Sequence, residues 1–197
     1  MVRRFDNFFG KTLLTCLLAL LALMLMPHGS AGATDVDVTT AKLESSEEGY
    51  RMVAAFSFEL SHGLEDAITR GIPMYFTTEV ELTRPRWYWF DEKTIRSSQT
   101  VRIAYNLWTR KYTAAINGSL QQNFSTLEEA LALVLRPRRW LVADKGVLSP
   151  GEVYNVAVRL KLDINQLPKP FLITALNNSD WRLSSDWKRF TFKADEK

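Results

Sequence analysis

The amino-acid sequence predicts a mostly β protein, an antiparallel β-sandwich of the immunoglobulin-like or a related kind, with two short helices. Residues 50–60 and 154–162 alternate apolar side chains with polar or small ones, as strands with one buried face do. Asn117-Gly118 is a typical hairpin turn. The expected strands follow one another through short turns rather than crossover helices, which favours antiparallel sheets packed face to face.

The first 33 residues have the features of an export signal. Three basic residues open this segment: Arg3, Arg4 and Lys11. An apolar run of 14 residues follows at 13–26, and Ala31-Gly32-Ala33 is a small-x-small cleavage site. A membrane-spanning helix needs about 20 apolar residues, which makes an uncleaved anchor the alternative. We expect a signal peptide over residues 1–33, cleaved after Ala33, and a periplasmic protein with a single β-sandwich domain over residues 34–197.

The expected domain is nearly neutral and lacks cysteine. Cys16, the one cysteine of the chain, lies in the expected signal peptide, so the domain cannot form a disulfide. The whole chain has 25 basic and 22 acidic residues, of which three basic and one acidic precede residue 34. The remaining net charge of +1 does not indicate a nucleic-acid partner.

In the first half of the domain we expect three strands and a helix. The strands are expected at residues 35–43, 50–60 and 74–83. Leu64, Ala67 and Ile68 lie on one face of a short helix, with Ser61 as its N-cap and Gly71 near its end.

In the second half we expect a hairpin, four further strands and a second helix. The strands are expected at residues 100–107, 111–116, 119–124, 139–143, 154–162 and 187–192. Ser125-Thr126-Leu127-Glu128 has the pattern of a capping box, and the helix after it ends before Pro137. After Leu167-Pro168-Lys169-Pro170 we expect a mixed segment before the last strand.

Enzymatic chemistry has little support in the residue inventory. His62 is the one histidine of the domain, and its place beside a glycine at a strand–helix junction is typical of a turn or capping residue. Glu79 and Glu81 share one face of a strand, as a glycosidase pair could. They lie opposite the apolar residues, however, and we therefore expect them to face solvent. No metal site and no cofactor are expected.

The stretch "RPRWYWFDEK", residues 84–93, is the first candidate site. An unbroken strand would point two arginines into the core, so we expect a bulge at Pro85 that turns Trp87 and Trp89 inward. The residues left outside form a candidate partner-binding edge: Arg84, Arg86, Tyr88, Phe90 and Lys93. The alternative is a mainly structural stretch, since edge arginines also prevent aggregation.

A second basic cluster is the candidate patch for an anionic ligand such as a lipid headgroup or a glycan. It consists of Arg136, Arg138, Arg139 and Trp140. At the end of a helix the same arginines would complement the helix dipole, which is the alternative. The segment "WRLSSDW", residues 181–187, is either a further aromatic surface loop or a pair of hydrophobic anchors.

Long strings of the sequence resemble a known exported family of Gram-negative bacteria. They are "LSHGLEDAITRGIPMYF", "ELTRPRWYWFDEK", "YNLWTRKY", "FSTLEEALALV" and "LPKPFLITALNNSDWRLSSDW". The chain resembles, over nearly all of the expected domain, the family catalogued as domain of unknown function 4390. That family has no assigned activity and therefore implies no functional residues. Its members are often encoded beside a nitrogen-type sensor kinase, so the resemblance implies an accessory protein that contacts such a sensor.

Together these features predict a non-enzymatic periplasmic binding or accessory protein. Its expected partner is an envelope protein, such as the extracytoplasmic part of a membrane sensor kinase. The alternative is a module that binds an envelope glycan or lipid.

Overall fold

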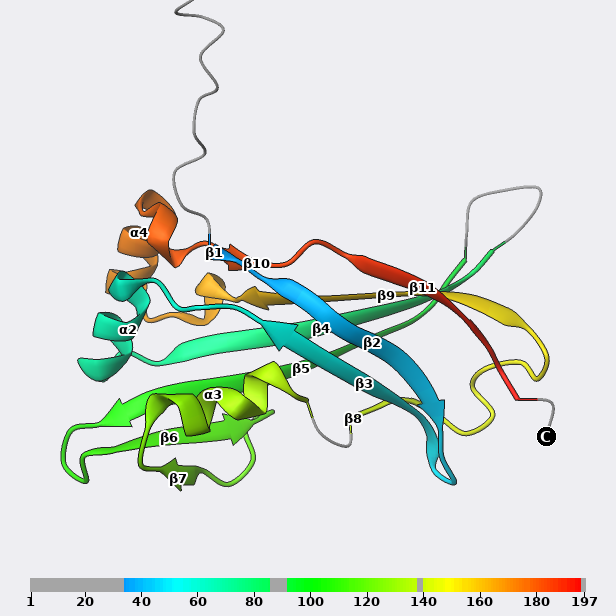
Figure 1. Cartoon of the computed structure of the whole chain (residues 1–197), viewed down its shortest axis with the longest axis horizontal. Coiled ribbons are helices and arrows are strands. Elements are labelled where there is room, and N and C mark those ends of the chain that lie inside the picture. Colours follow the sequence, from blue (N-terminus) through cyan, green and yellow to red (C-terminus); the bar gives the residue numbers. More distant parts are fainter. Residues whose placement is uncertain (1–33, 86–91, 138–139, 196–197) are drawn as a thin grey trace, which may run out of the picture. The chain divides into compact units, whose positions relative to one another are not determined.

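Two β-sheets and three helices make up the part of the chain that the computed structural model describes, residues 34–85, 92–137 and 140–195 (Figure 1). The protein is mostly β, and the sheets are antiparallel in all pairs but one short parallel pair, as the alternating sequence pattern predicts. No helix of the described ranges is long and apolar enough to cross a bilayer.

The larger sheet is built around two long central strands, β4 (Met74–Arg84) and β9 (Val153–Leu162). Its strand order is β1-β10-β9-β4-β5-β6-β7, and β11 also pairs with β9. The remaining bounds are β1 (Thr34–Asp35), β10 (Leu183–Ser184), β5 (Glu92–Asn106), β6 (Lys111–Ile116), β7 (Gln122–Phe124) and β11 (Lys188–Lys193). On one edge of β9, Lys161 pairs with β10, whereas Val153 to Val158 pair with β11.

The smaller sheet contains β2 (Asp37–Ser45), β3 (Gly49–Ser57) and β8 (Trp140–Asp144), in the order β2-β3-β8. It crosses one face of the larger sheet (Figure 1). Phe58 stacks on Phe76 with ring centroids 6.1 Å apart, and Tyr50 meets Phe192 edge to face at 5.6 Å. These contacts belong to one hydrophobic core, which makes the fold a β-sandwich.

Three short α-helices complete the fold: α2 (His62–Thr69), α3 (Leu127–Leu135) and α4 (Lys169–Asn177). Two single turns of 3-10 helix flank α4: η1 (Ile164–Gln166) and η2 (Ser179–Trp181). Ser61 caps α2 as predicted, because its side chain accepts a hydrogen bond from Leu64 N. At α3 the N-cap is Thr126 rather than Ser125, and Glu129 rather than Glu128 reaches back, accepting from Ser125 N.

The sequence predicted two helices and missed α4. This helix begins with Pro170 in its first turn, has no side-chain cap, and buries only Ala175. A proline at this point is compatible with a helix start, since the first helical N–H groups have no partner within the helix. The proline-bracketed segment therefore marks a helix start instead of an irregular connection.

The core lies within residues 36–194, and Val36 and Ala194 are its outermost members among the described residues. Its largest fully buried side chains include Tyr154, Phe76 and Met52. A chain that starts at Thr34 contains every strand and helix of the described ranges.

The Asn117-Gly118 turn gives the first test of this fold. Both residues have positive φ, 47° and 73°, and Ser119 N donates to Ile116 O at 2.8 Å. A Cβ at Gly118 would meet nothing within 4 Å, so Gly118→Ala should cost only the left-handed backbone strain, roughly 1–2 kcal/mol in the free energy of unfolding. Gly118→Asn, the matched control, should cost clearly less because asparagine tolerates this conformation. Urea denaturation measures both; equal losses would contradict the backbone explanation.

Candidate functional site

The candidate site lies on the outer face of the larger sheet, turned away from the core. The even-numbered residues of β4 from Met74 to Leu82 and those of β9 are buried, so the odd-numbered ones project from the other face. The strand register places Glu81 of β4 and Arg189 of β11 on either side of Ala157 of β9. Because alanine is short, a hollow forms between the glutamate and the arginine.

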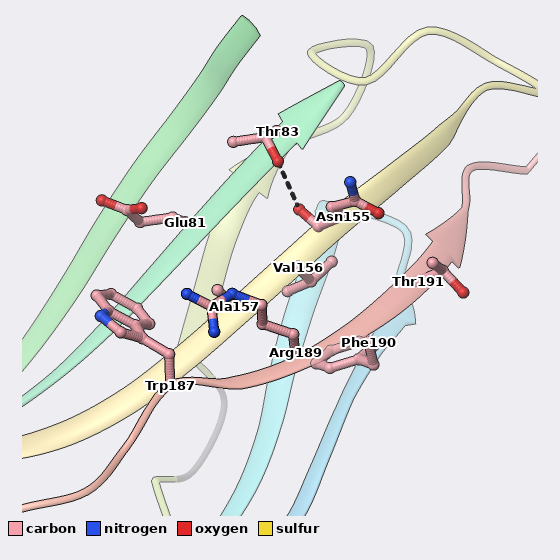
Figure 2. A pocket seen from close by; sticks show the side chains of 9 residues that line it. All are labelled: Glu81, Thr83, Asn155, Val156, Ala157, Trp187, Arg189, Phe190 and Thr191. Carbon is pink, nitrogen blue, oxygen red and sulfur yellow. Dashed lines mark hydrogen bonds between the residues drawn. The ribbon is translucent and has the colours of Figure 1, made fainter. Parts of the chain in front are cut away.

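This hollow is a groove of about 450 Å³, open to solvent (Figure 2). The next row of the sheet continues it with Thr83, Asn155 and Thr191, which are also register partners. The lining residues are Glu81, Thr83, Asn155, Val156, Ala157, Trp187, Arg189, Phe190 and Thr191. The groove therefore combines one acid, one base, three uncharged polar side chains and the ring of Trp187.

Ion pairs between neighbouring strands neutralise the carboxylates of this face. Glu79 binds Arg159 and Lys161 of β9, each at 2.7 Å, and Glu81 binds Arg96 of β5 at 2.9 Å. Side chains directly opposite one another across two strands are close enough for such pairs. The two carboxylates thus hold three cations in place beside the groove: Arg96, Arg159 and Lys161.

Trp187 forms one wall of the groove and is held by a cation. The guanidinium carbon of Arg159 lies 4.4 Å from the centroid of a Trp187 ring, within the range of a cation–π contact. The tryptophan occupies the gap where β9 changes partner from β10 to β11. Ser185 fixes that gap, since its hydroxyl accepts from Leu160 N at 3.0 Å and its N–H donates to Leu160 O at 2.8 Å. The ring is half-buried and one part of it faces the groove.

Arg189 differs from Arg96, Arg159 and Lys161, the paired cations beside the groove. It is exposed, and it forms no ion pair with any residue in the described ranges. Figure 2 shows its guanidinium extending over β9 beside Ala157. An arginine without a partner beside a groove is well placed to bind an external carboxylate or phosphate.

The carboxylates are poorly suited to acid catalysis. Burial raises the pKa of Glu79, but the hydrogen bonds from Lys161 and Arg159 outweigh this effect and bring the pKa below its ordinary value. A general acid at neutral pH needs the opposite shift.

The expectation that Glu79 and Glu81 lie on the solvent side of their strand is correct. No cluster of three metal-ligating side chains occurs in the part of the chain described here.

The first predicted site lies mostly outside the described residues. Arg86, Tyr88 and Phe90 belong to residues 86–91, as do Trp87 and Trp89. Arg84 is half-buried and pairs through its backbone with Glu92, while Lys93 pairs with Thr83 at the end of the groove. The bulge is not at Pro85, which follows the end of β4, but between Leu82 and Thr83. The partners of these two residues, Ile95 and Lys93, leave Thr94 as the extra residue on β5.

One residue of the second predicted site, Trp140, does not lie at the surface. Trp140 is 5% exposed and lies opposite Met52 in the smaller sheet, so its ring belongs to the core and is not available to a ligand. Arg136 is exposed and caps α3, whereas Arg138 and Arg139 lie outside the described residues. In "WRLSSDW" the two tryptophans differ, since Trp181 is buried and Trp187 lines the groove.

Sequence reasoning missed the residues that form the groove. Ala157 and Arg159 appeared only as the polar or small members of an alternating strand, and Arg189 only as part of the last strand. Trp187 was noted within its segment, but nothing local distinguished it from Trp181. The signal that could have identified them is the register between β4, β9 and β11, which joins residues about 80 positions apart such as Glu79 and Arg159.

The ion pairs of Glu79 predict a pH-dependent stability. Glu79→Gln should lower the free energy of unfolding at pH 7 by about 1 kcal/mol, as for a good but partly exposed pair. The folded pKa lies below 4.5, so the wild-type contribution is complete above that pH and is lost as the pH falls through the folded pKa. The difference between the two proteins should therefore vanish in acid. Glu152→Gln, at an exposed site, is the control, and a Glu79→Gln difference that stays constant with pH would contradict the assignment.

Comparisons with known proteins place the chain in a family. The family model described as Domain of unknown function (DUF4390) matches residues 33–191. No curated protein and no solved structure matches the chain significantly. The match spans both sheets and all three helices, including every residue that lines the groove. The chain therefore belongs to the DUF4390 family.

Proposed function

We propose that the protein is an exported, non-enzymatic accessory protein that binds another protein of the cell envelope through the groove on its larger sheet. One observation carries this proposal: Arg189 is exposed and without an ion pair among the described residues, whereas Glu81, the other charged residue of the groove, is paired with Arg96. Among the described residues of the groove, Arg189 is thus a cation without a partner, and a binding protein would complement it with an acidic side chain.

The rest of the groove suits an extended segment of a partner protein. Trp187 provides an aromatic wall that Arg159 holds in one orientation, so little side-chain entropy is lost when a partner covers it. Thr83, Asn155 and Thr191 provide hydroxyl and amide groups along one row. An aromatic anchor beside an arginine is the composition typical of binding hot spots.

The partner we propose is the extracytoplasmic part of a membrane sensor kinase. Support comes from the signal-like features of residues 1–33, which favour a periplasmic location, and from the gene neighbourhood that the family resemblance implies. A glycan or lipid site at residues 136–140 has less support, because Trp140 is buried.

Crosslinking in living cells tests the proposal. A photo-reactive amino acid at position 189 should give one discrete protein adduct, identified by mass spectrometry, and the same residue at the exposed position 136 should not. Arg189→Glu should reduce capture of that partner at least tenfold, and Arg189→Lys should retain most of it, since charge orients the complex. The melting temperature should not change in either variant, because the side chain is exposed.

Two outcomes would overturn this proposal. One is crosslinking from position 136 that equals that from position 189. The other is partner capture by Arg189→Glu at the wild-type level.

A further inference from the structure

A second surface lies at the end of the molecule where α2, α4 and the β5–β6 turn are found (Figure 1). The contacts there are continuous: α4 packs on η2, η2 on α2, and α2 on β5. Seven large hydrophobic residues are exposed in the described ranges, and four of them are at this end, Leu107 and Trp108 in the turn and Ile173 and Leu176 on α4. We name these four residues the apolar end.

Hydrogen bonds fix the backbone of the β5–β6 turn, and the tryptophan of this turn is exposed. The Asn106 side-chain oxygen accepts from Trp108 N at 2.9 Å and from Thr109 N at 3.1 Å. At the base of the turn the rings of Tyr105 and Tyr112 lie 4.9 Å apart. Trp108 is nevertheless 96% exposed, so the turn is ordered without burying the side chain at its tip.

The charged residues of the turn itself have one sign. Arg110 and Lys111 follow Trp108 after Thr109, and no acidic residue occurs between Asn106 and Lys111. On the neighbouring helix α2, Asp66 is paired with Arg70. On α4 the one charged residue is Lys169, also a cation. An exposed tryptophan flanked by basic residues is typical of side chains that enter the interface of an anionic bilayer.

We propose that the apolar end is a membrane-contact surface, with Trp108 and Leu107 entering the interface of an anionic phospholipid bilayer and Arg110 and Lys111 binding its headgroups. Ile173 and Leu176 add a second apolar contact from α4. This surface is separate from the groove and does not depend on the function proposed for it.

Vesicle co-sedimentation tests this surface with a chain that starts at Thr34, which contains every described strand and helix. Wild type should bind vesicles of equal parts phosphatidylglycerol and phosphatidylethanolamine. Trp108→Ala should weaken binding about tenfold, as expected for one large apolar side chain. Arg110→Gln and Lys111→Gln should each weaken it about fivefold on these vesicles, and neither should matter on purely zwitterionic ones. Leu120→Ser is the matched control: Leu120 is 92% exposed but lies in the β6–β7 connection.

A fluorescent label gives an independent readout, because a chain from Thr34 has no cysteine of its own. An environment-sensitive dye on Thr109→Cys should shift to the blue when vesicles are added, and the same dye on Val147→Cys should not. Absence of wild-type binding at low salt, or equal binding by wild type and Trp108→Ala, would overturn the proposal. A shift of the Thr109→Cys dye only in the presence of another envelope protein would likewise overturn it and identify the apolar end as a protein interface.

Discussion

The register between β4 and β9 is the constraint on which the rest of this structure depends. Val80 lies opposite Val158 and Leu82 opposite Val156, so both strands place their apolar residues on the same face. The same register sets Glu79 opposite Arg159 and Glu81 opposite Ala157 on the other face. A shift of one residue in this register would turn the buried side chains of the shifted strand to solvent and place its charged side chains in the core. Core and groove are therefore two faces of one strand pairing, and a change in its register would alter both.

A second consequence follows from the way β9 is shared on its other edge. β10 pairs with β9 only at Lys161, and β11 pairs with β9 from Val158. The segment between β10 and β11 therefore forms no strand pairs for a few residues. Trp187 immediately precedes β11, and the β11–β9 register extended by one residue places it opposite Arg159 on the outer face. Its ring therefore meets the guanidinium of Arg159. The start of the β11–β9 pairing thus positions the aromatic wall of the groove.

Local patterns in the sequence were sufficient for individual elements. Strict alternation identified β3, β4 and β9, the Asn117-Gly118 pair identified a hairpin turn, and Ser61 marked the start of α2. Each of these signals acts between residues that are close in the chain. The helix α4 was missed since it has no side-chain cap and buries one alanine, so neither of the usual signals is present.

The site was harder to predict because it depends on contacts between distant segments. Glu79 and Glu81 were correctly assigned to the solvent side. The cations that pair with them lie on β9 and β5, however, and no local sequence pattern predicts the order of strands in a sheet. Trp140 was assigned to a surface because basic residues precede it. Its position in β8 opposite Met52 instead turns it into the core. Basic neighbours describe what surrounds a side chain in the sequence, whereas strand register decides which face it occupies.

The two proposed surfaces are compatible because they lie at different positions along the length of the larger sheet. β4 starts at Met74, beside the end that carries α2, and reaches the groove at Glu81 seven residues later. At about 3.3 Å per residue along a strand, this separates the groove from that end by roughly 23 Å. A domain resting on the bilayer through Trp108 would therefore hold Arg189 well above the headgroups. At that height the proposed partner, the extracytoplasmic part of a membrane protein, would reach the groove and the lipid would not, so membrane contact would orient the groove and concentrate it near such a partner.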